Sequence, residues 1–237
     1  MRRIGFSSGA LAYADFRTGV AMLRNKAVDA LELSALRQNE LRPMLDGIDE
    51  LDLSQFAYIA FHAPSQFRPE DEGEIVNLLA GVCNRGWPVI LHPDAIFDFS
   101  LWRRLGHMLC VENMDKRKPI GRTVSELERV FDRLPDASFC FDIGHARQVD
   151  STMTEAYLIL KRFSGCLRQV HLSEVNTRSR HDPLSYASIL AFQEVAPFIP
   201  EEVPIILETP VPEDQIEFEI AQATEALPLA QPVLAAR

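Results

Sequence analysis

Short apolar runs recur along this chain at intervals of roughly 30 residues, the usual length of one strand-plus-helix unit. The runs are rich in Val, Ile and Phe, and several are preceded by Pro, Gly or Asp. Such runs are typical of buried β-strands. Eight strands are therefore expected, at residues 2–7, 30–34, 58–63, 88–92, 108–113, 138–143, 168–173 and 204–209.

The segments between these runs carry apolar residues at helical spacing. Thr123 with Glu126, and Thr152 with Glu155, match the capping-box pattern that begins helices. The connection between the fourth and fifth runs is short, so its helix is expected to have only about two turns. Helices are also predicted within residues 16–28, 70–85, 184–198 and 213–226.

Alternation of strands and helices favours parallel strands joined by crossover helices. The length of 237 residues is close to the about 250 residues typical of a closed (β/α)8 barrel. An open, doubly wound sheet is the alternative, but its GxGxxG loop is missing after the first run. We predict an α/β chain with a single TIM-barrel domain over residues 1–237, of which 227–237 form a C-terminal tail.

Polar residues collect where the predicted strands end. Acids and histidines at these places advance along the chain by roughly one strand-plus-helix unit at a time, and barrel active sites are built at this end of the strands. His107 precedes its strand, so it is expected on the opposite face with a structural role. The strand-end set comprises Glu32, His62, His92, Glu112, Asp142, His171 and Glu208, with His145 and His181 in loops just beyond.

Side-chain alternation turns this set toward the barrel axis. Residues two apart in a strand share a face, and the positions two before the strand-end residues are mostly small or apolar: Ala30, Ala60, Ile90, Cys110, Cys140, Gln169 and Ile206. Buried carboxylates need compensation, and no matching set of strand-end Lys or Arg occurs. A single strand-end histidine is usually only a hydrogen-bonded polar residue. The whole set instead predicts a divalent transition metal, Zn, Mn, Fe or Co, with one to three ions.

Two loops predicted on the same face are basic. The loop after the fifth strand holds Lys116, Arg117, Lys118 and Arg122, and the loop after the seventh holds Arg178 and Arg180. Solvated loop charges are one interpretation. The other is recognition of a phosphate or carboxylate. We predict a small anionic or polyhydroxylated substrate, contacted by Glu32, Lys116, Arg117, Arg178 and Arg180.

Composition restricts the partners. The net charge of −10 disfavours nucleic acid, because neutralisation of phosphates drives that binding. Four cysteines without a CxxC pair are expected to be free thiols in a reducing compartment. No stretch has the length of a signal peptide or membrane span, so a cytoplasmic location without membrane contact is expected. A homodimer is compatible with the barrel.

The motifs FHAPS, LHPD, VEN, FDIGHA, QVHLSE, RH at 180–181 and IILETP resemble the xylose isomerase-like TIM barrels over nearly the whole chain. This superfamily includes sugar phosphate isomerases and epimerases as well as endonuclease IV, of AP endonuclease family 2. In the isomerase branch, the resemblance implies one manganese or similar ion held by Glu112, Asp142, His171 and Glu208. It further implies that the two glutamates move protons.

The endonuclease IV branch implies three zinc ions and a longer set of ligands. The matching residues are His62, His92, Glu112, Asp142, His145, His171, His181 and Glu208. That pattern also has an Asp two residues before the His of its DRH motif, where this chain has Ser179. Asp182 could replace it only in a rebuilt loop.

Three functions follow as hypotheses. The first is a metal-dependent isomerase or epimerase that moves a proton at a carbon next to a carbonyl, with Glu112 and Glu208 as catalytic groups. The second is a zinc-dependent phosphodiesterase similar to endonuclease IV. The third is a barrel that binds a metal or sugar without catalysis.

Overall fold

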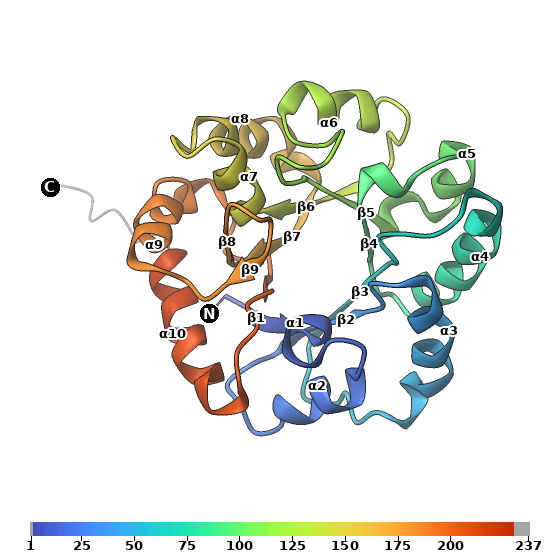
Figure 1. Cartoon of the computed structure of the whole chain (residues 1–237), viewed down its shortest axis with the longest axis horizontal. Coiled ribbons are helices and arrows are strands. Elements are labelled where there is room, and N and C mark those ends of the chain that lie inside the picture. Colours follow the sequence, from blue (N-terminus) through green and yellow to red (C-terminus); the bar gives the residue numbers. More distant parts are fainter. Residues whose placement is uncertain (1, 230–237) are drawn as a thin grey trace, which may run out of the picture.

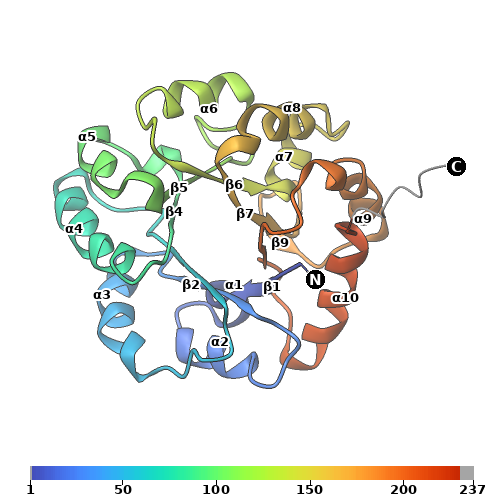
Figure 2. The ribbon, with the colours of Figure 1, turned by 180° about the vertical axis from the view of Figure 1, so that it is seen from behind.

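A computed structural model describes residues 2–229, which form a closed barrel of eight parallel strands inside a ring of helices (Figures 1 and 2). The strand order around the barrel is β1-β10-β7-β6-β5-β4-β3-β2. All eight predicted strands and the TIM-barrel fold are confirmed. The strands are β1 Ile4–Ser7, β2 Ala30–Ser34, β3 Tyr58–His62, β4 Val89–Leu91, β5 Leu109–Glu112, β6 Ser138–Asp142, β7 Leu167–Leu172 and β10 Ile205–Leu207.

The predicted helices are present, with shorter bounds in several places. The segment predicted at 16–28 stops being helical after Met22, and Asn25 has a positive φ of 61°. The short connection before β5 holds one helical turn followed by a 3-10 segment, as expected. The helices are α1 Ser8–Ala12, α2 Phe16–Met22, α3 Gln38–Gly47, α4 Glu72–Cys83, α5 Phe99–Trp102, α6 Val124–Phe131, α7 Ile143–Val149, α8 Thr154–Phe163, α9 Tyr186–Gln193 and α10 Ile216–Ala226.

The predicted capping box at Thr123 is half formed, because the Glu126 carboxylate accepts the Arg122 backbone N–H and not that of Thr123, and the box predicted at Thr152 is wrong. Thr123 caps α6 through a bond from the Glu126 backbone N–H, but Thr152 does not cap α8. The N-cap of α8 is Met153, in the left-handed region with φ 59°. Asp150 accepts the Glu155 backbone N–H instead, because a carboxylate two residues upstream of Thr152 competes for the same donor.

The end of the barrel at which the strands terminate contains two elements that the sequence patterns do not predict. His145 lies in the first turn of α7 and not in a loop, since this helix begins directly after β6 with Asp142 as its N-cap. A two-stranded antiparallel hairpin, β8 Glu174–Val175 and β9 His181–Asp182, follows β7. A Cβ at Gly144 would stand 2.4 Å from the Ser173 carbonyl oxygen, so only glycine lets α7 pack this closely against the end of β7.

Small side chains fill the barrel interior below the strand ends. Ala60, Ile90, Cys110 and Cys140 form a buried cluster, with Tyr58 packed against it. This arrangement confirms the predicted alternation, which places the polar strand-end residues one layer higher on the same inner face. Within residues 2–229, all four cysteines are free thiols.

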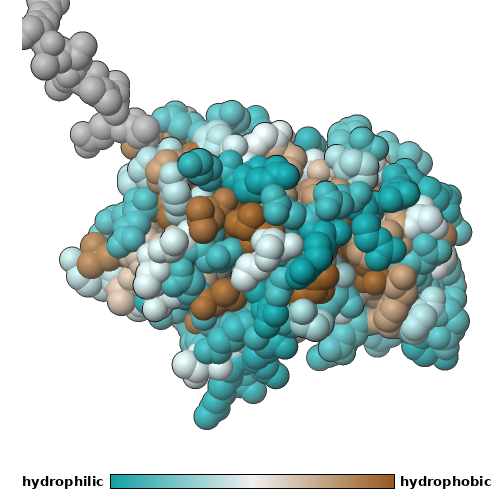
Figure 3. Space-filling view, turned by 90° about the horizontal axis from the view of Figure 1, so that it is seen from above, coloured by the Kyte–Doolittle hydropathy of each residue, from teal (hydrophilic) through white to brown (hydrophobic). Residues whose placement is uncertain are grey.

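The C-terminal part remains in the fold further than predicted. Leu227, which the sequence analysis places in the tail, is buried in the core, because it follows α10 directly and packs with the outer helices. Residues 230–237 of the predicted tail lie outside the described residues. The face seen in Figure 3 is largely hydrophilic, with apolar residues in small separate groups. In the described part of the chain, no helix combines the length and apolarity needed to cross a membrane.

A buried carboxylate near the short fourth connection provides a test of the fold. Glu72 accepts hydrogen bonds from the backbone N–H groups of Phe97 and Asp98 and from Trp102 Nε1, at 2.7–2.9 Å. Glu72→Ala should lower the unfolding free energy by about 3 kcal/mol, because one buried and two partly buried donors lose a charged acceptor. Urea unfolding would measure this, with the exposed Glu70→Ala as control; equal stability of the two variants would contradict it.

Candidate metal centre

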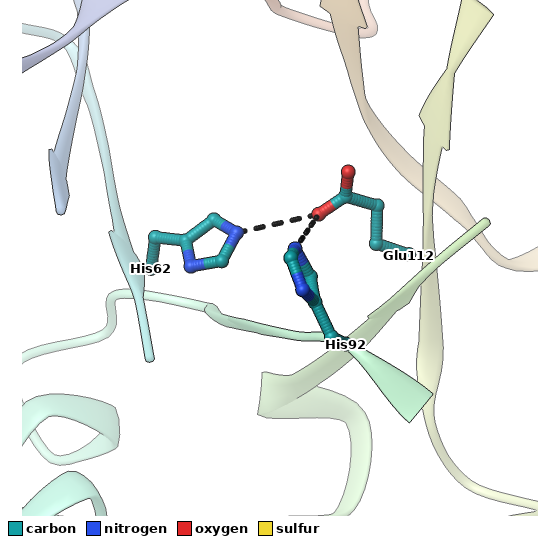
Figure 4. Close-up of side chains that lie close together, drawn as sticks. All are labelled: His62, His92 and Glu112. Atoms are coloured by element: carbon teal, nitrogen blue, oxygen red, sulfur yellow. Dashed lines mark hydrogen bonds and ion pairs between the residues drawn. The ribbon is translucent and has the colours of Figure 1, made fainter. Parts of the chain in front are cut away.

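Glu112, at the end of β5, lies at the centre of the strand-end set. Its carboxylate oxygen Oε2 is 3.3 Å from His62 Nε2 and 3.4 Å from His92 Nε2. Figure 4 shows both imidazoles, from the ends of β3 and β4, pointing at this oxygen. The other oxygen, Oε1, is 3.3 Å from His145 Nδ1 and 3.4 Å from His171 Nδ1. Each oxygen therefore faces its own pair of imidazoles, so this carboxylate would be a ligand candidate for two cations. His145 Nδ1 also lies 3.0 Å from the Asn113 carbonyl oxygen.

Two further carboxylates close around the second of these pairs. Asp142 Oδ2 is 3.2 Å from His145 Nδ1, and Glu208 Oε2 is 3.6 Å from Nδ1 of both His171 and His181. Potential ligand atoms of Glu112, Asp142, His171 and Glu208 lie within 4.8 Å of one another. The structure therefore brings the four residues of the predicted isomerase set together at one point.

Two other groups of potential metal ligands share residues with the set of Glu112, Asp142, His171 and Glu208. His62, His92 and Glu112 form one, and Glu32, His62 and Glu208 form another, by the same 4.8 Å criterion. Glu112 thus belongs to two groupings that meet at its carboxylate.

Unsatisfied polar atoms support a metal at this place. Asp142 Oδ2, His171 Nδ1 and His92 Nδ1 are buried without a hydrogen-bond partner among the described residues. Leaving such groups unpaired is costly. A cation coordinated by Asp142 Oδ2 and His171 Nδ1 would satisfy both, and imidazole together with carboxylate suits Zn, Mn, Fe or Co. The residues present therefore fit a divalent transition metal.

A polar chain below the metal-ligand candidates orients His171. Tyr58 donates its hydroxyl to Gln169 Oε1 at 2.7 Å, and Gln169 Nε2 donates to Glu32 Oε2 at 2.7 Å. The same Glu32 oxygen is 2.9 Å from His171 Nε2. With that nitrogen protonated toward Glu32, Nδ1 presents its lone pair to the metal site.

Glu32 differs from its sequence-based interpretation. The sequence predicts a substrate contact, but the Glu32 side chain is fully buried and does not line the pocket described below. Its position in the middle of β2 places it one layer beneath the strand ends. From there its carboxylate reaches an imidazole and not the open mouth of the barrel.

Burial and nearby charges shift the pKa values of the acids and histidines in this cluster. Burial is the main cause that raises the pKa of Asp142 to about 6 and also raises the pKa of Glu208. Burial alone would lower the pKa of His171, but Glu208, Glu32 and Glu112 outweigh it and hold that pKa well above its usual value. The metal-free cluster therefore keeps protons that a bound cation would displace.

A pocket of about 540 Å³ opens above the cluster. Its volume is in the range of small-molecule sites. Predicted site residues that line it are His62, His92, Glu112, His145, Arg180, His181 and Glu208. His107 is exposed and lies before β5, at the opposite end of the barrel, as expected.

The basic loops contribute only partly to this pocket. Arg180 lines it, and so does Lys118, whose Nζ is 2.8 Å from Asp94 Oδ2. Lys116, Arg117 and Arg178, for which the sequence predicts substrate contacts, do not line the pocket. The Arg117 guanidinium instead donates to the Arg178 carbonyl oxygen at 2.6 Å and joins the two loops.

Ser179 stands beside a carboxylate that the sequence analysis does not include. Its hydroxyl donates to Asp115 Oδ1 at 2.6 Å, and both residues line the pocket. Asp182 does not take this place, because Asn176 Nδ2 donates to it within the hairpin. The only sequence signal for Asp115 is its position three residues after Glu112, and a loop residue needs the tertiary fold to show where it points.

Comparisons with known proteins agree with the fold. The sequence matches no protein-family model and no curated protein. Among solved structures, the chain is similar to a xylose isomerase domain protein from Alicyclobacillus acidocaldarius, with TM-score 0.63 and 10% identity over 96% of this chain and 98% of that one. It is similar to endonuclease IV from Thermus thermophilus, with TM-score 0.57 and 19% identity over 93% and 98%.

A third similar structure is a xylose isomerase-like TIM barrel protein from Mycobacterium smegmatis in complex with magnesium, with TM-score 0.57 and 13% identity over 96% and 98% of the two chains. At these identities the similarity establishes a common fold. The fold implied by the motif resemblance is therefore confirmed.

The shared position of Glu112 predicts the result of metal analysis. We expect two divalent ions per chain in metal-loaded protein, and loss of both in Glu112→Ala, because this carboxylate belongs to both groupings. Chelation of both ions should lower the melting temperature by roughly 10 to 20 °C relative to protein with ion at about 100 times Kd. Elemental analysis and calorimetry measure these effects. Glu174→Ala is the control, and unchanged metal content in Glu112→Ala would refute the bridging arrangement.

Proposed function

We propose that this protein is a metal-dependent isomerase or epimerase of a small anionic polyhydroxylated molecule, such as a sugar phosphate or sugar acid. The observation that carries the proposal is the convergence of Glu112, Asp142, His171 and Glu208. Glu112 and Glu208 line the pocket of about 540 Å³, whereas Asp142 and His171 are fully buried. A divalent ion held there would polarise a substrate carbonyl and acidify the adjacent C–H.

Glu208 is the residue best placed to move the proton. Its side chain is 13% exposed and lines the pocket, whereas that of Glu112 is 1% exposed and has imidazoles facing both of its oxygens. In an isomerase reaction, the Glu208 carboxylate takes the proton from the carbon beside the carbonyl and returns it to the neighbouring carbon, while the hydroxyl proton passes to the carbonyl oxygen. In an epimerase reaction, Glu208 takes the proton and a second acid must deliver one to the opposite face of the same carbon. Glu112, the other catalytic residue predicted from the sequence, would act mainly by holding the metal.

The rest of the pocket supports an anionic substrate. Arg180 has no carboxylate within 4.0 Å among the described residues, so its guanidinium is available to a phosphate or carboxylate. The net charge of −10 makes a polyanion such as nucleic acid an unfavourable partner. A small anion bound in the pocket would interact mainly with the nearby positive charge of Arg180, and less with the negative charge spread over the rest of the protein.

Solvent deuterium exchange tests this function. Metal-loaded protein incubated in D2O with ribulose 5-phosphate, xylulose 5-phosphate and fructose 6-phosphate should introduce deuterium beside the carbonyl of at least one of them. Glu208→Gln should slow the exchange by about 100-fold or more, because an amide cannot accept the proton. NMR spectroscopy measures the exchange.

The control for this test is the exposed Glu213→Gln, which should exchange as the wild type does. Metal content of each variant is measured in parallel, since Glu208 is also a ligand candidate. If Glu208→Gln retains its metal and exchanges normally, Glu208 is not the proton carrier. If the loaded wild type exchanges none of the three sugars, the proposal fails for pentulose and hexulose phosphates.

A zinc-dependent phosphoester hydrolase is the second candidate. It is supported by the two imidazole pairs on the separate oxygens of Glu112, since paired ions are common in such enzymes. Ser179 in place of the Asp of the endonuclease pattern, and the acidic net charge, weigh against action on DNA. Binding of metal and ligand without either reaction would support the third hypothesis, a barrel without catalysis.

Hydrolysis is measured separately. Zinc-loaded protein is incubated with bis(p-nitrophenyl) phosphate and with a duplex that contains an abasic site. Under the isomerase proposal, neither is cleaved faster than by Glu112→Ala. Release of p-nitrophenol or strand nicking that disappears in Glu112→Ala would favour the hydrolase instead.

A further inference from the structure

Tyr13 is an exposed aromatic residue at the mouth of the pocket. It ends α1, which lies inside the ring of outer helices and beside the strand ends (Figure 1). Its side chain is 78% exposed and is one of the residues that line the pocket. Exposed tyrosines elsewhere, such as Tyr186 on α9, do not line it.

The backbone of Tyr13 adopts a conformation that favours glycine. Its φ is 52° and its ψ is −124°, a region that residues with a Cβ rarely occupy. The turn is closed by a hydrogen bond from the Tyr13 N–H to the Gly9 carbonyl oxygen at 3.0 Å, which glycine would make equally well. Because the ring is exposed, burial does not compensate for this strain. Strain of this kind without a stabilising role is a recognised sign of a functional position.

Leu36 extends the apolar surface on which Tyr13 lies. It follows β2, is 39% exposed and lines the same pocket. A Cβ at Gly9 would be 3.3 Å from Leu36 Cδ1, so α1 and the Leu36 side chain pack directly together. Ser65 fixes this loop, since its backbone N–H and hydroxyl both donate to the Leu36 carbonyl oxygen. Gly9, Ala10, Tyr13 and Leu36 therefore form one side of the pocket, which we call the apolar wall.

Two basic side chains also line the pocket, Lys118 from the loop after β5 and Arg180 from the loop after β7. In the ring of eight strands, β5 lies diametrically across from β1, whereas β7 is only two places from β1. Lys118 is already neutralised by Asp94 at 2.8 Å, which leaves Arg180 as the more available charge. A ligand above the metal-ligand candidates would therefore meet both the apolar wall and the Arg180 guanidinium.

We propose that Tyr13 and Leu36 form a platform for the ring of an anionic, ring-bearing substrate, and that Tyr13 is a specificity-determining residue. An aromatic side chain binds the apolar face of a ring by stacking, while Arg180 pairs with the anionic group. The inference rests on the proposed function and deepens it by naming the preferred substrate as an anion that carries a ring, such as the cyclic form of a sugar phosphate. Its test depends on the pocket and not on the reaction that occurs there.

Matched pairs of small anions test the platform. Calorimetric titration of metal-loaded protein should show phenyl phosphate binding about three- to tenfold more tightly than methyl phosphate, the range expected for one aromatic contact. Tyr13→Phe should keep this preference and Tyr13→Gly should abolish it, with little change for methyl phosphate. Because glycine suits the backbone of this turn, Tyr13→Gly should unfold at the same or a higher urea concentration.

Controls separate the contribution of the apolar wall from that of Arg180. Tyr186→Ala, which removes another largely exposed tyrosine, should bind both ligands as the wild type does. Arg180→Gln should weaken both phosphates by a similar factor. Benzoate and acetate, titrated in the same way, show whether the site prefers a carboxylate or a phosphate. The isomerase proposal fails if no sugar exchanges deuterium, whereas the platform is refuted if Tyr13→Gly retains the preference for the phenyl ligand or the wild type shows none.

Discussion

The buried carboxylate of Glu112 is the group on which the structure of the site depends. It is 1% exposed and lies among imidazoles from four different strand or helix ends. Isolated, such a charge would be very costly to bury. The carboxylate is surrounded by His62, His92, His145 and His171, so it contacts side chains from separate parts of the barrel mouth. Cations there would replace repulsion among the neighbouring acids with coordination.

Side chain-to-backbone hydrogen bonds between neighbouring strand ends hold this arrangement in place. Asn113, next to Glu112, donates to the Asp142 carbonyl oxygen and accepts the Asp142 backbone N–H, both at 2.8 Å. Asp142 in turn accepts the His145 N–H at 2.6 Å. Two ligand candidates, Asp142 and His145, are thus positioned by bonds that leave Asp142 Oδ2 available. Such support from a second layer of residues is what metal centres generally require.

Much of the site could be predicted from the sequence because the fold is periodic. Polar residues at the ends of successive strands must converge on one face of a closed barrel, so Glu112, Asp142, His171 and Glu208 can be identified without a structure. Loop residues have no such constraint. The direction of Lys116, Arg117 and Arg178 away from the pocket depends on contacts between two loops. Tyr13 and Asp115 could not be predicted as pocket residues from the sequence, because each reaches the pocket through a turn whose direction only the tertiary structure shows.

The sequence by itself determined the barrel and the identity of the strand-end ligand candidates, because strand period and strand spacing are local properties. Only the tertiary structure decided what each polar residue faces. The sequence predicts strand-end positions for both Glu32 and Glu112. In the structure, Glu32 lies one layer lower in the barrel and contacts His171, whereas Glu112 faces four imidazoles. The apolar wall of Gly9, Ala10, Tyr13 and Leu36 likewise exists only once β1 and β2 lie side by side. Contacts between distant segments depend on chain closure, which local patterns do not encode.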